Sequence, residues 1–288
     1  MSRKKGWHLD WRPQKKTMVL IENVQAILEE NADYLPMTLR QIFYQLVVRD
    51  QIPKTETGYN SMTDHLVSAR RAKMIPFSSI RDDGFTGSLY VGYDSADDYI
   101  NGLAARAEYL DLDLQNWQEL RLIVWCEAGG MVPQLKRVAS PYGIPVLSSG
   151  GFDSVTSKYN MARAVSDQPH HIIHIGDFDP SGEHIASSLI ADMRGFSDEP
   201  IGFTRLAVTE EQGRSYDLPT ALPKKTDNRS FSGTETIQAE ALRPELLAKI
   251  LKDGIVDLID HDSFVIALLA QQEARRSVTK ALEGIGLE

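Results

Sequence analysis

The first third of the chain places apolar and polar residues at helical spacing. Within residues 14–36 apolar side chains recur every three or four positions, and acidic residues occupy the opposite face. Segment 37–52 repeats this pattern after Thr38, which we expect to be its N-cap, and Pro53 closes it. Segment 59–76 has the same spacing. The pattern therefore predicts three short helices.

A short β-like run, GSLYVGY at 87–93, follows the third predicted helix, whose end carries Arg70, Arg71 and Lys73. Three helices and a small β element within roughly 80 residues are typical of a winged-helix or helix-turn-helix module, whose third helix commonly meets DNA. Many three-helix bundles share the pattern. The three cations are either a solvated helix end or contacts to phosphates.

After a helical stretch around 95–117 the residue pattern changes to short β-rich runs separated by helical segments. The β-rich runs are 120–127, 143–149, 171–177 and 203–208, and the helical patterns between them are about 130–140, 154–165 and 181–194. This alternation predicts an α/β domain with a mostly parallel sheet, whose functional groups gather at the carboxyl ends of the strands. Residues 235–283 read as largely helical.

These patterns divide the chain into parts of different charge. The predicted parts are a basic tail at 1–16, a winged-helix domain at 17–93, a connecting helical segment at 94–118 and an α/β domain with C-terminal helices at 119–288. The first 90 residues carry 13 Lys and Arg against 10 Asp and Glu, and the remainder carries 18 against 30. A polyanion could meet the first part and cations the second, although solvated surface charge explains both equally well.

Composition narrows the class of protein. The chain has 288 residues, of which 42% are hydrophobic and 25% charged, as expected of a globular protein, and its net charge of −9 argues against indiscriminate binding to nucleic acid. Cys126 is the only cysteine, which excludes an intrachain disulfide and a cysteine-rich zinc site. No stretch approaches the ~20 apolar residues of a membrane span, and the basic N-terminus lacks a signal peptide's apolar region. We expect no membrane association and a cytoplasmic location.

Three carboxylates end two of the predicted strands. Glu127 ends the first β-rich run, and Asp177 and Asp179 end the third, so a parallel sheet brings all three to one edge. Clustered carboxylates repel, and a divalent cation removes that cost; oxygen ligands alone favour Mg²⁺. An isolated Asp-x-Asp after a strand is often a helix cap plus a surface charge, and that alternative stays open.

These motifs resemble a known family. WCEAGG at 125–130, followed by IGDFDPSGEH at 175–184, resembles the Toprim domain, a metal-binding α/β fold of topoisomerases, primases and some nucleases. TLRQIFYQLV at 38–47 is similar to the Arg-x-x-aromatic-Tyr motif of the type IIB topoisomerase A subunit (topoisomerase VI A) and its meiotic double-strand-break relatives. Segments 216–227 and 236–251 are similar to stretches near the end of such A subunits. The resemblance implies a winged helix at 17–93 and a Toprim-like domain at 119–288.

The resemblance also implies a role for each motif residue. Tyr44 matches the tyrosine that attacks DNA and becomes linked to a 5′ end, and Arg40, one helical turn away, would hold a phosphate oxygen. Glu127, Asp177 and Asp179 match the acids that hold Mg²⁺, and proton transfer by Glu127 is not separable from ligation. A phenol with a pKa near 10 is a poor nucleophile at neutral pH, so Tyr44 needs help from a cation or a base.

The implied partners are duplex DNA and a second copy of the chain. Two staggered breaks need two tyrosines, and in the family each tyrosine works with the metal site of the other subunit. The chain contains no ATPase domain, so strand passage would require a separate GHKL ATPase subunit of the B type. Ala128 stands where A subunits usually have a lysine. These features suggest a minimal A-like protein, associated with the nucleoid, a phage or a mobile element.

Two other functions fit the same sequence. A Toprim nuclease would use a water activated by the metal and would leave no protein attached to DNA. A DNA-binding protein without activity would tolerate loss of the carboxylates. By itself Tyr44, next to Phe43, would be a core aromatic.

Four other polar residues have structural interpretations. His171 and His174 lie three apart in a predicted strand and so face opposite sides, and we expect His170 to precede that strand. We therefore interpret the three histidines as structural. Glu240 could join the acidic site, but we expect it at a helix entry or on the surface.

Overall fold

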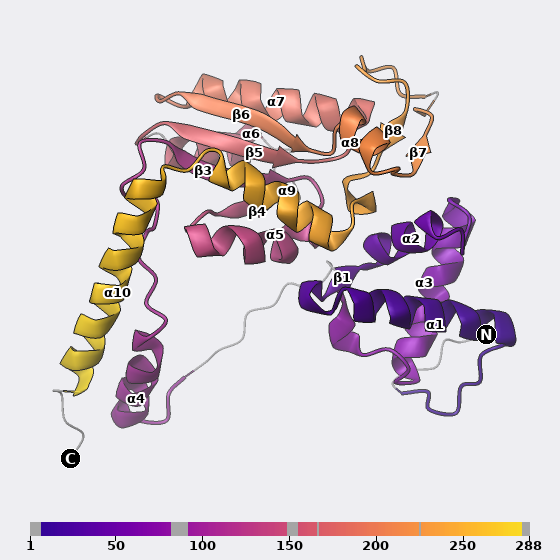
Figure 1. Ribbon diagram of the computed structural model, residues 1–288, viewed down its shortest axis with the longest axis horizontal. Coiled ribbons are helices and arrows are strands. Elements are labelled where there is room, and N and C mark those ends of the chain that lie inside the picture. The colour runs from indigo at the N-terminus through magenta and orange to yellow at the C-terminus, as the bar shows by residue number, and fades with distance from the viewer. Residues whose placement is uncertain (1–6, 82–91, 149–154, 166, 225, 284–288) are drawn as a thin grey trace.

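The computed structural model describes the chain except for residues 1–6, 82–91, 149–154, 166, 225 and 284–288 (Figure 1). Its N-terminal part consists of three helices, as predicted: α1 (Lys15–Glu30), α2 (Leu39–Val48) and α3 (Glu56–Arg71). Their apolar faces share one core that includes Ile21, Val24, Ile42, Leu46, Met62 and Leu66. The two-residue strand β1 (Met37–Thr38) directly precedes α2 and pairs in parallel with β2 (Ile80–Arg81).

A capping box starts α2. The hydroxyl of Thr38 accepts a hydrogen bond from the backbone N–H of Gln41 (3.1 Å), and the Gln41 side chain accepts one from the N–H of Thr38 (2.9 Å). The predicted N-cap is confirmed, because these two bonds satisfy N–H groups that the first helical turn leaves open.

The predicted β run at 87–93 falls mainly within 82–91 and so lies outside the described residues. Its last two residues, 92 and 93, are not in a strand. The winged-helix assignment therefore stays a prediction.

Four parallel strands form the central sheet, which confirms the predicted α/β arrangement. They are β3 (Arg121–Cys126), β4 (Val146–Ser148), β5 (His170–Ile175) and β6 (Ile201–Ala207), in the order β4-β3-β5-β6. The observed β4 starts later than predicted, at Val146, and β6 starts earlier, at Ile201, because these are the first residues that pair with the neighbouring strands. The predicted position of His170 before the strand was wrong, since His170 pairs with Arg121 as the first residue of β5.

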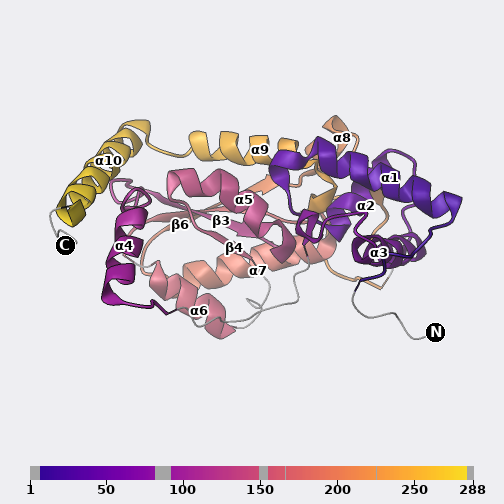
Figure 2. The same ribbon diagram turned by 90° about the horizontal axis from the view of Figure 1, so that it is seen from below.

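Helices cover both faces of the sheet (Figure 2). One face carries α5 (Val132–Ala139) and α9 (Pro244–Val256), and the other carries α6 (Val155–Ala164) and α7 (Pro180–Phe196). Side chains along β3 alternate between the two cores: Leu122, Val124 and Cys126 face α5 and α9, whereas Ile123 and Trp125 face α6 and α7. Burial on both faces explains why the strands read as continuous apolar runs.

The remaining elements lie at the two ends of the sheet. At the end away from the N-terminal part, α4 (Ala96–Ala107) packs on α10 (His261–Glu283) (Figure 1). At the other end lie α8 (Glu210–Ser215) and an antiparallel pair, β7 (Thr220–Ala221) and β8 (Thr236–Ile237). Short 3-10 helices are η1 (Ala32–Tyr34), η2 (Phe77–Ser79), η3 (Gly129–Met131), η4 (Ser140–Tyr142) and η5 (Ala239–Ala241).

Within the described ranges, none of the helices has the length and apolar character that a membrane crossing requires.

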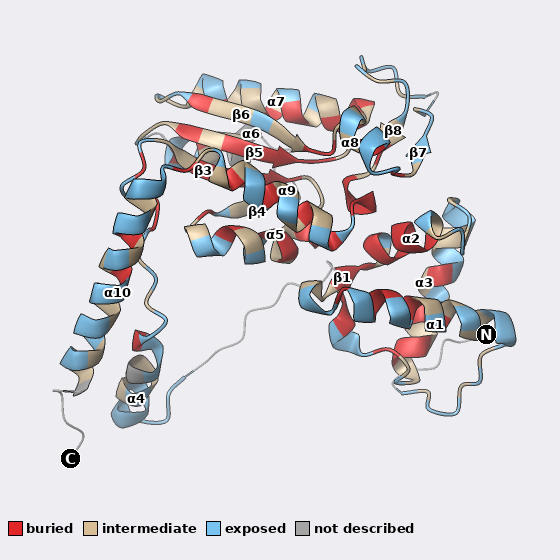
Figure 3. Ribbon diagram, in the orientation of Figure 1, coloured by how far each residue is buried: buried red, intermediate tan, exposed pale blue. Residues whose placement is uncertain are grey.

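The N-terminal part docks on the carboxyl edge of the sheet through buried polar contacts. The amide of Gln41 donates to the side-chain oxygen of Gln134 on α5 (2.7 Å), and the Thr38 hydroxyl donates to Glu240 of η5 (2.7 Å). Residues 41–46 of α2 are buried and drawn red in Figure 3, as are the last residues of β3, β5 and β6. These contacts place α2 beside the strand ends.

Candidate functional site

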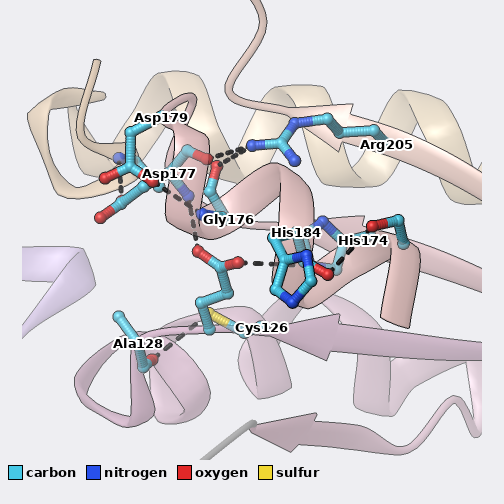
Figure 4. A network of polar contacts seen from close by, with 12 residues as sticks. Cys126, Ala128, His174, Gly176, Asp177, Asp179, His184 and Arg205 are labelled. Atoms are coloured by element: carbon cyan, nitrogen blue, oxygen red, sulfur yellow. Dashed lines mark hydrogen bonds and ion pairs between the residues drawn. The ribbon is translucent and has the colours of Figure 1, made fainter. Parts of the chain in front are cut away.

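The three predicted carboxylates lie together at the carboxyl edge, on neighbouring strands. Glu127 follows β3 and Asp177 follows β5, and the two strands pair along their full length. The Oε2 atom of Glu127 accepts a hydrogen bond from the backbone N–H of Asp177 (2.9 Å). Asp177 and Asp179 lie at the turn that leads from β5 into α7 (Figure 4). The topology therefore brings together the acids that the sequence predicted to meet.

Each of these carboxylates uses one oxygen on a backbone N–H. Oδ1 of Asp177 accepts from the N–H of Ala239 (2.8 Å), and Oδ1 of Asp179 accepts from the N–H of Gly182 (2.7 Å), which makes Asp179 the N-cap of α7. The helix-cap alternative is thus correct for Asp179. Capping does not exclude ligation, because a carboxylate has a second oxygen.

Glycines make room for the Glu127 side chain. A Cβ on Gly176 would lie 2.5 Å from the Glu127 carboxyl carbon, and a Cβ on Gly182 would lie 2.3 Å from the Asp177 carbonyl oxygen. No side chain fits at such distances, so any larger residue would displace the carboxylate or the turn.

Burial and mutual repulsion disfavour negative charge in this cluster. Burial raises the pKa of Glu127 to about 7, the Asp177 N–H lowers it, and the Asp177 charge raises it. Burial also raises the pKa of Asp177, with Asp179 adding to the rise. A bound cation would remove this penalty.

Arg205 holds the turn that carries Asp177. Its guanidinium donates to the carbonyl oxygens of Gly176 (3.3 Å) and Asp177, as Figure 4 shows. Burial lowers the pKa of Arg205, and the charge of Glu127 opposes that change. Arg205 therefore positions the turn and supplies the positive charge nearest to its carbonyl groups.

The donor set fits Mg²⁺ in kind. Among the described residues, the buried Oε1 of Glu127 has no hydrogen-bond partner, which is costly for a carboxylate oxygen unless a ligand meets it. All three candidates are oxygen donors, as Mg²⁺ prefers. No group of three Asp, Glu, His or Cys side chains within the described ranges is already gathered around a single point.

The histidines keep their structural interpretation. His174 is fully buried, with its ring 5.5 Å from that of Phe203, and burial lowers its pKa to about 3. Its Nε2 lies 3.9 Å from Oε1 of Glu127, too far for a hydrogen bond. His171 faces the opposite side of β5, where its Nε2 lies 2.8 Å from the Thr204 hydroxyl.

Tyr44 and Arg40 line an open pocket of about 370 Å³ at the seam. Lys224 and Gln238, which come from the far side of the seam, line the same pocket. Gln238 directly precedes Ala239, the residue whose N–H binds Asp177. The structure thus brings the motif tyrosine and arginine near the acidic edge of their own chain.

The environment of Tyr44 makes its phenol a weak acid. The residue is 8% exposed, and burial raises its pKa to about 12. The negative charges of Asp177 and Glu240 add to the rise, whereas Arg40 lowers the pKa. Deprotonation of this phenol therefore needs additional positive charge nearby.

Glu240 corrects an expectation. Its surface placement was wrong, because the residue is 5% exposed and accepts a hydrogen bond from the Thr38 hydroxyl. Its Oε2 also lies 3.9 Å from Nε of Arg40. Glu240 therefore connects the two parts of the molecule through its contacts with Thr38 and Arg40 at the N-terminal end of α2.

The three cations predicted to contact DNA differ in exposure. Arg70 is 6% exposed, with its guanidinium 5.3 Å from the Phe77 ring centre. Arg71 is half-buried, and Nζ of Lys73 lies 4.8 Å from the ring centre of Trp7. Arg71 and Lys73 are better placed than Arg70 to reach a phosphate.

Two site residues were missed by sequence reasoning. Arg205 had a detectable signal, since it is the one charged residue in the apolar run 203–208. Lys54 had none, because a lysine in a loop before a helix is usually a solvated residue.

Comparison with known proteins adds no family assignment. No protein-family model matches the sequence, and none of the curated proteins matches it. The Toprim and type IIB topoisomerase resemblances therefore remain predictions.

Proposed function

We propose that the protein cleaves duplex DNA by transesterification through Tyr44, with Mg²⁺ held by Glu127, Asp177 and Asp179. The observation that carries this proposal is the placement of Tyr44 and Arg40 in one pocket beside that carboxylate edge. The proposed fold is a winged helix joined to a Toprim-like domain, as in type IIB topoisomerase A subunits.

The reaction exchanges one phosphoester bond for another. The Tyr44 phenol loses its proton and its oxygen bonds to phosphorus, while the bond from phosphorus to the 3′ oxygen breaks and that oxygen gains a proton. Arg40 would hold a phosphate oxygen and stabilise the developing charge, which its 59% exposed side chain can reach. The 5′-phosphotyrosyl bond retains the energy of the broken ester, so the step is reversible.

The carboxylates would hold Mg²⁺ through the oxygens that do not accept from backbone N–H groups. A bound Mg²⁺ supplies positive charge for the phosphate or the leaving 3′ oxygen. Arg205 would keep the turn with Asp177 in place, and Glu127 would be held by the N–H of Asp177.

Trapping of a covalent adduct tests the proposal. Protein, Mg²⁺ and labelled duplex DNA are mixed, denatured and treated with nuclease, and label that stays on the protein is measured. Wild-type protein should retain label, Tyr44→Phe should lose at least 100-fold, and chelation should abolish the signal. Tyr59→Phe is the matched control, because Tyr59 packs against Phe43 and lines the same pocket. Full labelling of Tyr44→Phe would refute the proposal.

A second candidate is hydrolysis by water activated at the metal site. The raised pKa and the burial of Tyr44 favour it, because they make the phenol a poorer nucleophile. In that reaction Tyr44→Phe still cuts DNA and releases free 5′-phosphates.

Two copies of the chain would be needed to cut both strands. We therefore include a homodimer in the proposal, and a separate B-type ATPase for any strand passage. Without such a partner the protein would cut and rejoin DNA but would not couple cleavage to strand passage.

A further inference from the structure

Positive side chains from both sides of the seam gather in the Tyr44 pocket. Arg40 and Lys54 come from the N-terminal part, and Lys224 comes from the loop after β7. Among the described residues that line the pocket, Glu56 is the one acidic side chain. The pocket thus differs in charge from the carboxylate edge behind it.

Lys54 is held in place at this pocket. Its Nζ donates to the carbonyl oxygen of Pro219 across the seam (3.0 Å) and lies 5.7 Å from the ring centre of Tyr44. An ammonium has three donors, and within the described ranges Lys54 makes one hydrogen bond, so donors remain for a ligand. The carbonyl fixes the ammonium beside the phenol.

Burial makes the charge of Lys54 costly in the free protein. Desolvation lowers the pKa of Lys54, and the Glu235 charge raises it only in part. An anion in the pocket would raise the pKa of Lys54 again, because an opposite charge nearby favours the charged ammonium. Lys224 is exposed on the opposite wall, so its side chain is free to reach the same anion from the solvent side.

We propose that Lys54 and Lys224 bind a phosphodiester group of DNA in this pocket, beside Arg40 and Tyr44. The inference rests on the proposed cleavage and names two contacts that the Arg-x-x-aromatic-Tyr motif does not contain. One chain builds the whole pocket from both of its parts, so phosphate binding links the docking of the N-terminal part to the chemistry of Tyr44.

A single phosphate contact has a measurable signature. Each lysine that neutralises a phosphate contributes about 0.9 to the slope of log K against log salt on duplex DNA. Binding is measured by fluorescence anisotropy of a labelled duplex between low and moderate salt, in a Tyr44→Phe background with chelator so that DNA stays intact.

Each charge-removing variant should make the slope of log K against log salt less steep by about one unit. Lys54→Gln keeps a donor for the Pro219 carbonyl, and Lys224→Gln changes an exposed side chain, so both should fold. Lys54→Arg should keep the slope. The matched control is Lys252→Gln, an exposed lysine on α9 that lines a different pocket and should leave the slope unchanged.

The outcomes separate this inference from the proposed cleavage. An unchanged slope in folded Lys54→Gln and Lys224→Gln overturns the phosphate site, whether or not the wild type forms adducts. A reduced slope in both, with no adduct from the wild type, supports the phosphate site and refutes the cleavage. In an active wild-type background, loss of either charge should lower the adduct rate at least tenfold.

Discussion

Glu127 is the residue on which the proposed metal site depends most. One of its oxygens holds the Asp177 N–H, and the other is buried without a partner among the described residues. Asp177, Asp179 and Arg205 are the charged groups that act on it, and His174 lies beneath it in neutral form. Below about pH 7 the free protein therefore favours a protonated Glu127, and Mg²⁺ would favour the anion.

Stability should depend on pH through this carboxyl. The folded pKa of about 7 lies above the unfolded value of 4.5, so the stability from protonated Glu127 is complete below pH 4.5 and is lost as pH rises through 7. The loss is roughly 3 kcal/mol. His174 acts in the opposite direction, because its lowered pKa makes stability rise with pH.

The comparison with Glu127→Gln isolates the effect. Urea denaturation without metal should show the variant gaining stability relative to wild type between pH 4.5 and 7, and Mg²⁺ should erase that gap by stabilising the wild type. A gap that does not change with pH would contradict the account of Glu127.

Arg205 should matter for stability and for Mg²⁺ affinity. Arg205→Met removes the charged donor from the carbonyl groups of Gly176, Asp177 and Val208, which should cost roughly 2–3 kcal/mol in urea denaturation. The Mg²⁺ midpoint should rise as the Asp177 turn loosens. Arg214→Met is the control, because Arg214 is 76% exposed and, among the described residues, pairs with Glu210 of its own helix, so it should change stability by less than ~0.5 kcal/mol. Equal effects of the two substitutions would contradict the role given to Arg205.

At the scale of elements, α2 connects the cap, the seam and the pocket. Thr38 caps the helix with its oxygen and donates its hydroxyl hydrogen to Glu240. The helix then presents Arg40 and Tyr44 one turn apart. A change at Thr38 should therefore affect both stability and the position of Tyr44.

Thr38→Val should destabilise the protein by roughly 2–3 kcal/mol, because it removes the cap and one donor to a buried carboxylate. Thr38→Ser keeps both bonds and should stay within about 0.5 kcal/mol of wild type. Thermal or urea denaturation measures both. If Thr38→Val and Thr38→Ser were equally stable, the seam contact would have no energetic role.

Much of the element order was predictable, whereas the contacts across the seam were not. Helical spacing and apolar runs predicted the three N-terminal helices and the four strands, because these patterns follow from local geometry. The positions of the three carboxylates just after predicted strands also predicted that they meet at one edge of the sheet. Nothing local indicates that Glu240 meets Thr38 across 202 positions or that Lys54 reaches Pro219. The burial of Arg70 was missed for the same reason, since its burial depends on packing outside its helix.

At the scale of the whole molecule, Tyr44 and the carboxylate edge lie near each other within a single chain. The charge of Asp177 acts on Tyr44 of the same chain, and Gln238 joins Tyr44 in one pocket. A dimer would then carry two centres, one for each strand of the duplex.

Mixed dimers should reveal which chain serves which tyrosine. Tyr44→Phe and Asp177→Asn subunits with different tags are co-expressed, and the mixed dimer is purified on both tags. If Tyr44 works with its own carboxylates, both centres of the mixed dimer are defective and adduct formation should stay below about 1% of wild type. Adducts at about half the wild-type level would show that each tyrosine works with the partner's metal site.

The most direct test of the proposed function is to identify the atom that carries the DNA. Wild-type protein is trapped on duplex DNA with Mg²⁺, digested with protease and nuclease, and analysed by mass spectrometry. We predict one modified peptide, with a 5′-phosphonucleotide on the Tyr44 oxygen. Cut DNA with free 5′-phosphates and an unmodified Tyr44 peptide would contradict transesterification through this residue.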